Sequence, residues 1–407
     1  MTLMLGTTVA QAIPIIISPI LTRIYSPEEF GLLILFMSIV SILSVIVSLR
    51  YERAIIQPLD DEDAISLVVI SMLVTIGVST ILTILINIFY TQIQELIGNN
   101  EIGILKYWVP FAVLITGFYN SLYEWHVRKK QFALSAKIVM SKGAVTAGGQ
   151  VGLGAMMFPG GLIFGYLMGI VIAFFLLLKS FIKSKDFLIL IFNKKQLLKN
   201  VKKYKKMPQY STWGALADNV SLQMPTLVIA TLKHVSSVGI FGLTIRVLSL
   251  PANLLSQALS SVLFQKVAEL HYDDPDKIKI LIIKIFLILN FIMIPFVGLI
   301  WFFGENLFAF IFGEPWREAG VMASILVFAV AIRFVVSPLS VVLLLDHNIK
   351  LGTLWQFIYF ITITVTLYIV SSWPLNDFLI AFVIHEIILY FLYFIFILKG
   401  SNYSGKI

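Results

Sequence analysis

A few charged side chains fall deep inside segments that are otherwise apolar. Lys142, Asp218, Arg246 and Arg333 lie about 15–20 Å into predicted helices, and Lys137 is shallower. An Arg or Lys at the centre of a bilayer costs roughly 2.5–3.5 kcal/mol on insertion scales. We therefore expect these residues to face the protein interior, where they form ion pairs or line a path.

Two further basic residues mark one end of that path. Arg50 and Arg53 are three residues apart, which predicts one shared helix face near the cytoplasmic mouth. Basic groups outnumber acids, and Asp218 is the only deep acid that we count. A basic, water-filled cavity suits an anionic head group such as a diphosphate, which arginine binds in a bidentate manner. The predicted substrate-binding cavity comprises Arg50, Arg53, Lys137, Lys142, Arg246 and Arg333.

Asp218 has two interpretations. It could pair with Arg246 or Arg333 and hold two halves of the protein together, or it could couple transport to an ion. One acid cannot neutralise Lys137, Lys142, Arg246 and Arg333 together, so a surplus of positive charge remains. Glu124, His126, His385 and Glu386 could relay protons, but their positions near helix ends predict solvated side chains.

Enzymatic and metal-dependent functions have weaker support. There is no cysteine, and the histidines are scattered without a closely spaced pair, so we expect no metal site and no cofactor. Two acidic segments, 60–63 and 273–276, could hold magnesium around a prenyl diphosphate, as in a membrane prenyltransferase. Their positions beside Pro58 and Pro275 favour solvated turns over rigid metal ligands. An ion channel is a further alternative, but the sequence contains no channel-type selectivity filter.

The composition explains where these charges must be placed. Of 407 residues, 59% are hydrophobic and 13% are charged, and the mean hydropathy is +0.94. Stretches of about 20 apolar residues recur along the whole chain. We predict an all-α polytopic membrane protein of about twelve transmembrane helices. They are expected at 5–24, 31–57, 64–90, 103–124, 132–157, 159–180, 208–232, 236–265, 277–303, 319–345, 351–372 and 375–398.

The distribution of basic residues predicts the topology. With the N-terminus inside, the outside loops hold only Arg23, Lys106, Lys233 and Arg317, whereas ten lysines crowd one inside loop between the sixth and seventh helices. This asymmetry follows the positive-inside rule and places both termini in the cytoplasm. The net charge of +8 is thereby explained by topology and not by nucleic-acid binding. Lysines in this loop could also contact anionic membrane lipids.

Weak internal similarity predicts two pseudo-symmetric six-helix halves around a central cavity. With an offset of 208 residues, Gly6 matches Gly214, Gly31 matches Gly239, and Ser41 matches Ser249. The predicted domains are an N-terminal half at 1–180, a basic cytoplasmic linker at 181–207 and a C-terminal half at 208–407. Paired six-helix repeats are typical of transporters that bind substrate between the halves.

Several motifs resemble those of a known family. They are Gly6–Gln11, Leu21–Gly31, Arg50–Pro58, Gly239–Gly242, Arg246–Pro251 and Ile311–Trp316. Together they resemble the oligosaccharide flippases of the polysaccharide transporter family, within the multidrug/oligosaccharidyl-lipid/polysaccharide exporter superfamily. The resemblance implies flipping of an undecaprenyl-diphosphate-linked oligosaccharide, for O-antigen, capsule or a related polymer, across the bacterial inner membrane.

The resemblance also implies partners and alternatives. The partners would be the lipid-linked oligosaccharide, membrane lipids, and possible polymerase and glycosyltransferase enzymes. A multidrug or other small-molecule exporter of the same superfamily is the main alternative, and it would tolerate neutralised cavity charges.

The cavity hypothesis makes a direct prediction. Replacing Arg246 or Arg333 by Ala should abolish glycan display at the cell surface, because each guanidinium would contact the anionic head group. The measurement is surface glycan at matched protein level. Normal display in both variants would contradict the hypothesis.

Overall fold

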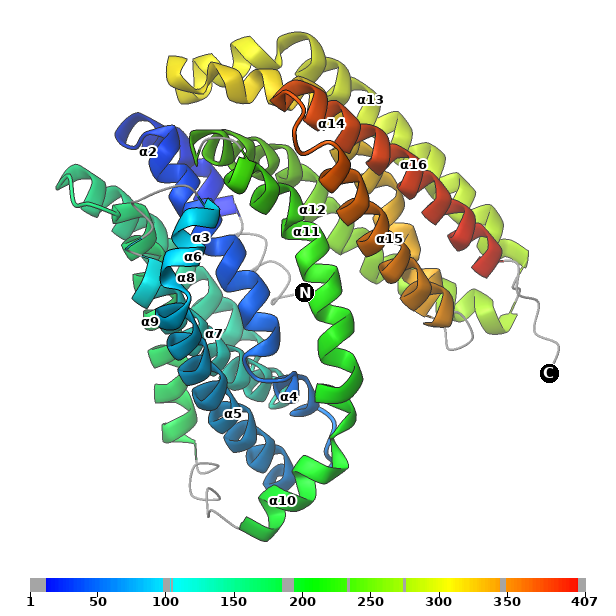
Figure 1. Cartoon of the computed structure of the whole chain (residues 1–407). Helices are drawn as coiled ribbons and strands as arrows, with labels where there is room; N and C mark the ends of the chain where they lie inside the picture. The colour runs from blue at the N-terminus through cyan, green and yellow to red at the C-terminus, as the bar shows by residue number, and fades with distance from the viewer. Residues whose placement is uncertain are drawn as a thin grey trace. The chain divides into compact units, whose positions relative to one another are not determined.

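The computed structural model describes residues 12–97, 103, 105–184, 194–232, 235–273, 276–344 and 349–401. The chain divides into two compact units, Met1–Gly239 and Ile240–Ile407. Within the first unit, α5, α7, α8 and α9 pack side by side, and α11 packs on α3 (Figure 1). The elements of this unit are α2 Ser18–Ile24, α3 Pro27–Ile46, α4 Tyr51–Ala54, α5 Asp61–Ile88, α6 Tyr90–Ile97, α7 Leu105–Arg128, α8 Phe132–Ala155, α9 Gly161–Lys183, α10 Lys194–Lys203, the π-helical turn Met207–Ser211 and α11 Thr212–Leu232.

The second unit is a separate group of long helices. Its α14 packs between α13 and α16, and α15 packs on α16. The helix α12 begins in the first unit and continues into the second. The elements are α12 Val235–Asp273, α13 Asp276–Phe312, a short turn Glu314–Trp316, α14 Arg317–Val336, the 3₁₀ helix η5 Ser337–Leu344, α15 Ile349–Ile369 and α16 Leu375–Ser401.

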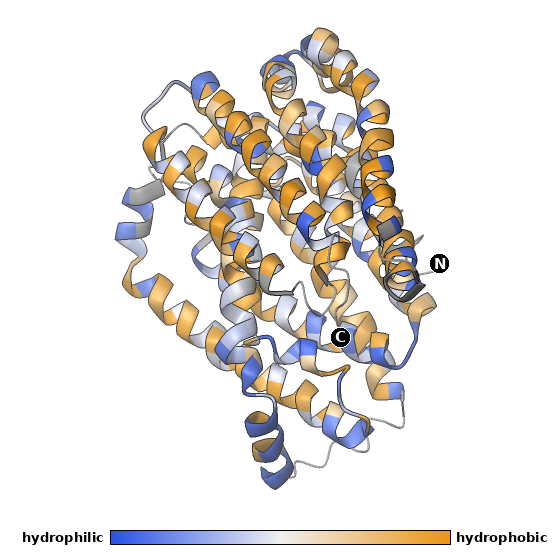
Figure 2. Cartoon of the chain, turned by 90° about the vertical axis from the view of Figure 1, so that its right-hand side faces the viewer, coloured by the Kyte–Doolittle hydropathy of each residue, from blue (hydrophilic) through white to orange (hydrophobic). Residues whose placement is uncertain are grey.

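The all-α membrane fold is confirmed. Each predicted segment overlaps one or more helices among the described residues, and six helical stretches satisfy criteria of length and hydropathy for crossing a membrane. Long hydrophobic stretches run along the helices (Figure 2). Large apolar side chains such as Phe310 and Tyr368 are more than four-fifths exposed, which is the expected state of a surface that faces lipid.

The predicted helix at 31–57 is wrong in its continuity. It starts earlier, at Pro27, because Ser26 and Glu29 form a reciprocal capping box. It stops at Ile46, and Leu49 and Arg50 adopt left-handed backbone conformations, with φ of 49° and 63°. Such conformations are costly for residues other than glycine. The break separates α3 from the short α4 and redirects the chain just where the two arginines lie.

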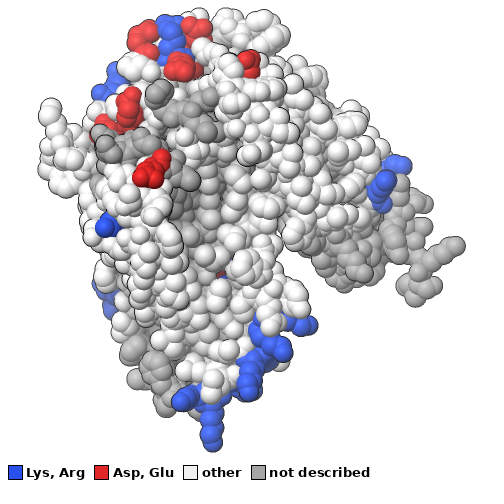
Figure 3. All heavy atoms as spheres, in the orientation of Figure 1, with Lys and Arg blue, Asp and Glu red and all other residues white. Residues whose placement is uncertain are grey.

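The first acidic segment, 60–63, was predicted to be a solvated turn, but one of its residues is buried. Asp63 is buried at the start of α5, where it accepts a hydrogen bond from Asn200 at 3.0 Å and lies near the ammonium groups of Lys199 and Lys203. These contacts attach the basic helix α10 to the first unit. The lysines of α10 form the basic surface visible at the lower end of this unit (Figure 3). Residues 274 and 275 of the second acidic segment lie outside the described residues.

A reciprocal contact supports the 208-residue repeat. A Cβ atom on Gly31 would collide with the carbonyl oxygen of Val235, and a Cβ on Gly239 would collide with the carbonyl oxygen of Pro27. Gly239 follows Gly31 by 208 residues, and Val235 follows Pro27 by the same number. Gly31 and Gly239 thus meet equivalent backbone atoms, each on the segment that is its counterpart in the repeat. The predicted domain limits at 180 and 208 stay a prediction.

This glycine contact can be tested by adding one methyl group. Gly239→Ala should lower the free energy of unfolding of the purified protein by about 1–3 kcal/mol, because the added methyl group would collide with backbone atoms of α3, which cannot move aside easily. Gly148→Ala is the control, since no atom lies within 4 Å of its added Cβ. Equal stability of the two variants would contradict the close crossing of α3 and α12.

Candidate functional site

A cavity of about 650 Å³ lies within the first unit. Residues of α3, α4, α7, α8, α9 and α11 line it, together with Arg50 at the break after α3. Its lining combines charged, amide, hydroxyl and aromatic groups: Met37, Val40, Ser41, Ser44, Val45, Arg50, Glu52, Arg53, Thr116, Tyr119, Asn120, Tyr123, Glu124, Val139, Tyr166 and Asn219. The structure therefore brings Arg50 and Arg53 together in one cavity, although not on one continuous helix.

Both arginines have acidic neighbours. The Arg53 guanidinium donates a hydrogen bond to Glu124 at 2.8 Å, and an Arg50 nitrogen lies 4.0 Å from Glu52. The Ser48 hydroxyl donates to the buried Glu52 carboxylate. The predicted surplus of positive charge is thus reduced at this position. These pairs stabilise the charges and leave part of each arginine available to a ligand.

Three polar atoms of the cavity wall lack a partner. The Nε of Arg50, the hydroxyl of Ser44 and the hydroxyl of Thr116 are buried without a hydrogen bond, and all three residues line the cavity. Most buried polar groups in proteins are hydrogen-bonded, and exceptions often have a functional reason. The wall of the cavity is therefore equipped to bind a polar ligand.

The other predicted residues of the first unit have different positions. The Lys142 ammonium lies 4.9 Å from the ring centroid of Tyr119, so it contacts a residue of the cavity wall without lining the cavity itself. Lys137 is exposed on α8 and does not line the cavity. Asp218 is exposed on α11, next to Asn219, and makes no ion pair with the described residues of the first unit.

Helix α11 closes one wall through paired side chains. Asn219 and Ser41 are 3.2 Å apart in a hydrogen bond, and Ser38 donates to Gln223 at 2.9 Å. The rings of Tyr119 and Tyr123 stack at 5.8 Å between centroids, and both residues also line the cavity. An aromatic surface, amides and hydroxyls next to arginine can together bind a polar, anionic ligand.

Arg333 belongs to a different group of residues, in the second unit. Its guanidinium donates to the fully buried Glu386 and to the Tyr359 hydroxyl, the latter at 2.6 Å. Arg246, on α12, is half-buried, and no ion pair joins it to another residue in the part of the second unit that the structure describes. A pair between Asp218 and Arg246 would join the two units and stays a prediction. Because Arg333→Ala would leave Glu386 unpaired, Arg246→Ala is the cleaner test of the cavity hypothesis.

The prediction that Glu124, His126, His385 and Glu386 are solvated is wrong. All four are less than one-tenth exposed. Glu386 is a second deep acid, and Glu52 is a buried acid that the sequence did not single out. The sequence did contain one signal for these acids, because each lies within an otherwise apolar helical stretch. A buried acid in such a stretch needs a cationic partner. No cluster of three or more potential metal ligands occurs in the described part of the chain.

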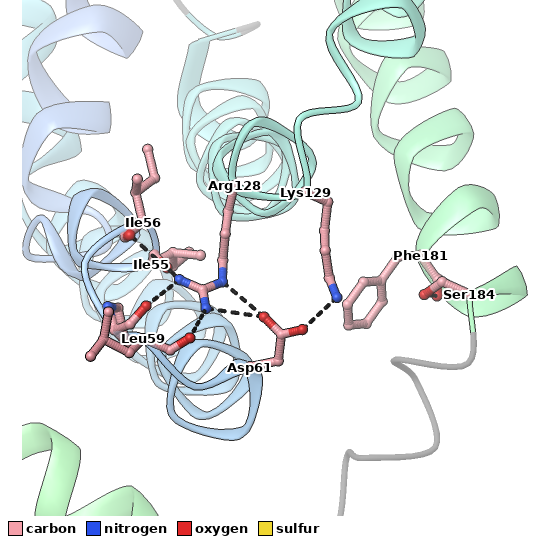
Figure 4. Close-up of polar contacts among 9 residues, drawn as sticks. Ile55, Ile56, Leu59, Asp61, Arg128, Lys129, Phe181 and Ser184 are labelled. Atoms are coloured by element: carbon pink, nitrogen blue, oxygen red, sulfur yellow. Dashed lines mark hydrogen bonds and ion pairs between the residues drawn. The ribbon is translucent and has the colours of Figure 1, made fainter.

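A clamp at the end of the first unit holds the segment that carries the arginines. Arg128 donates to Asp61 at 3.0 Å and to the carbonyl oxygens of Pro58 and Leu59 at 2.5 and 3.1 Å. Lys129 donates to the other oxygen of Asp61 at 2.7 Å (Figure 4). The clamp satisfies the carbonyl groups of a turn that lacks helical hydrogen bonds, and it ties α7 to the connection between α4 and α5.

Comparison with known proteins identifies the family. A family model described as polysaccharide biosynthesis protein matches residues 20–321. The chain belongs to this family. Over 180 residues it is 22% identical to an uncharacterized membrane protein in the cps region of Klebsiella pneumoniae; this match covers 44% of the chain and 37% of that relative.

Solved structures of transporters share the fold of this polysaccharide biosynthesis protein. The lipid II flippase MurJ in an inward closed conformation matches with a TM-score of 0.76 at 16% identity. The match covers 98% of this chain and 87% of the MurJ chain. An inward-facing multidrug resistance MATE family transporter of the MOP superfamily has a TM-score of 0.71 at 14% identity, with 99% and 96% coverage. The fold is therefore that of flippases and exporters.

The clamp leads to a stability prediction. Arg128→Ala should lower the free energy of unfolding by about 1–3 kcal/mol, because Asp61 and several carbonyl groups lose a charged donor. The measurement is thermal unfolding in detergent. Lys266→Ala is the control, since its pair with Glu269 is exposed on both sides and should contribute little. An unchanged melting temperature for Arg128→Ala would contradict the proposed role of the clamp.

Proposed function

We propose that this protein is a flippase that moves an undecaprenyl-diphosphate-linked oligosaccharide from the cytoplasmic to the outer leaflet of the bacterial inner membrane. The family and the fold support transport linked to polysaccharide biosynthesis. The proposal includes alternating access, with both termini in the cytoplasm as the positive-inside rule predicts.

The unpartnered polar atoms of the cavity carry the proposal. Arg50 Nε, the Ser44 hydroxyl and the Thr116 hydroxyl are buried and unbonded in a space of about 650 Å³. The guanidinium suits a diphosphate, and hydroxyls and amides such as Asn120 suit the hydroxyl groups of a sugar. Tyr119 adds an aromatic face for the apolar side of a sugar ring. A purely cationic or apolar drug would leave these donors unpaired.

The charge of the cargo provides a driving force. Each negative charge moved outward gains about 2.3 kcal/mol per 100 mV when the inside is negative. The head group enters beside Arg50 and Arg53, and the polyprenyl tail stays in lipid. The neighbouring genes should encode glycosyltransferases and a polymerase, because the cargo must be made on one side and consumed on the other.

Multidrug export is the second candidate, because the MATE transporter has a similar fold at a TM-score of 0.71. Ion-paired arginines in the cavity, such as Arg53 with Glu124, would be dispensable for a neutral drug. Deletion of the gene should then increase sensitivity to drugs and leave surface glycan unchanged. The proposed flippase function predicts the opposite pattern.

The residue-level test uses Arg50. Arg50→Asn removes the guanidinium, and Asn tolerates the left-handed backbone at this position. We expect about tenfold or greater loss of surface glycan at matched protein level, since a charge-assisted hydrogen bond contributes about 1.5–3 kcal/mol. Lys183→Asn, at the exposed end of α9, is the control and should display glycan normally. Normal display by Arg50→Asn would contradict the role of this cavity.

A further inference from the structure

The basic helix α10 is fixed to the first unit by its inner face. Asn200 is fully buried and donates a hydrogen bond to Asp63 of α5 at 3.0 Å. Leu197 packs against the apolar core of the unit. The Tyr51 hydroxyl of α4 donates to the Val201 carbonyl oxygen at 3.4 Å. The helix therefore has a fixed place, in contact with both α4 and α5.

The outer face of α10 combines basic and apolar side chains. Leu198 is 53% exposed and Val201 is 37% exposed. Lys194 and Lys202 lie one turn before and one turn after Leu198, and both are exposed on the same side of the helix. Within the part of the chain that the structure describes, neither of these two lysines forms an ion pair. The described residues therefore leave this face, with its two ammonium groups, uncovered.

The lysines of α10 also repel one another. Five of the ten residues of the helix are lysine. Lys195, Lys199 and Lys203 follow one another at a spacing of four residues, which places like charges side by side and destabilises a helix. Asp63 lies 3.9 and 3.8 Å from the ammonium groups of Lys199 and Lys203, so a single carboxylate faces two cations. Anions bound to the outer face would offset the remaining repulsion.

The position of α10 indicates which anions it meets. Asp63 is the third residue of α5, a helix with the length and hydropathy of a membrane span. The helix α10 lies at the end of the first unit where α5 begins (Figure 1). Lipid head groups start where a spanning helix leaves the hydrocarbon. A face of leucine and lysine suits this surface, because the apolar side chain enters the acyl boundary and the ammonium groups reach the phosphates.

We propose that α10 binds the phosphate groups of anionic phospholipids in the cytoplasmic leaflet, and that this contact stabilises the segment that carries the cavity arginines. The phosphates contact Lys194 and Lys202, and Leu198 enters the boundary between head groups and acyl chains. This site is separate from the cavity, since no residue of α10 lines that space. The orientation toward the cytoplasm follows from the positive-inside rule.

The segment after the Arg50 break depends on its neighbours for stability. The backbone amides of Tyr51, Arg53 and Ile55 each donate to the residue three positions earlier, as in isolated turns. Short segments of this kind open easily unless packing holds them. Tyr51 belongs to this segment and also contacts α10, so a lipid that stabilises α10 stabilises the arginine segment as well. The consequence for transport rests on the proposed function, whereas the lipid site does not.

Hydrogen–deuterium exchange of the full-length protein in nanodiscs tests the lipid site without transport. Nanodiscs of phosphatidylglycerol are compared with nanodiscs of phosphatidylcholine that have the same acyl chains. We expect the amides of residues 194–203 to exchange about tenfold more slowly, or slower still, in the anionic membrane. Residues 51–57 should follow in the same direction. Equal exchange of 194–203 in the two membranes would overturn the lipid site, and an unchanged 51–57 would overturn the link to the arginine segment.

Two double variants identify the lysines that carry the effect. Lys194→Gln/Lys202→Gln removes the ammonium groups of the outer face and should abolish most of the difference between the two membranes. Lys279→Gln/Lys284→Gln removes the same charge from exposed positions of α13 and should keep the difference. A difference that persists in the first double variant would overturn the assignment of the site to this face.

Flipping of the lipid-linked sugar in proteoliposomes tests the effect on transport. We expect the wild-type rate to be at least about threefold higher with phosphatidylglycerol than with phosphatidylcholine, and the rate of Lys194→Gln/Lys202→Gln to be equal in both. An equal wild-type rate in the two membranes would overturn the effect on transport and leave the flippase function standing. If the wild-type protein flips the sugar in neither membrane, the proposed function fails, but the exchange result is unaffected.

Discussion

The cost of an unpaired charge inside an apolar bundle is the constraint on which this structure depends. Hydrocarbon cannot solvate an ionised side chain, and removal of one partner from a buried pair commonly costs about 3–5 kcal/mol. Glu386 is buried against Arg333, and Glu124 is buried against Arg53. Each pair joins helices that are far apart in sequence, so the requirement for a partner also determines which helices must meet.

The same constraint separates structural charges from functional ones. Where every polar atom has a partner, as at the clamp around Arg128, the residues stabilise the fold. Where a buried donor has none and lines a cavity, as at Arg50 Nε, the structure can bind a ligand. We propose that this ligand is a polar, anionic molecule of the size of the cavity.

The helices and the repeat could be predicted from the sequence, because hydropathy and helix punctuation are local properties. The 208-residue offset is supported by the contact of Gly31 with Val235 and of Gly239 with Pro27. The break at Leu49 and Arg50 was missed because neither residue type favours a left-handed conformation. The roles of Glu124 and Glu386 were missed for another reason. Their partners, Arg53 and Arg333, are 71 and 53 residues away, so position within a helix did not reveal the pairing.

The central claim is that the protein flips a lipid-linked sugar and that cavity polarity selects it. The most direct measurement is flipping in proteoliposomes of pure protein, with undecaprenyl-diphosphate-linked N-acetylglucosamine, bare undecaprenyl phosphate and a lipophilic cationic dye compared side by side. We expect protein-dependent movement of the glycosylated diphosphate, faster when the membrane potential draws negative charge out of the source leaflet, and no movement of the dye. Transport of the dye without flipping of the glycosylated lipid would contradict the proposed flippase function.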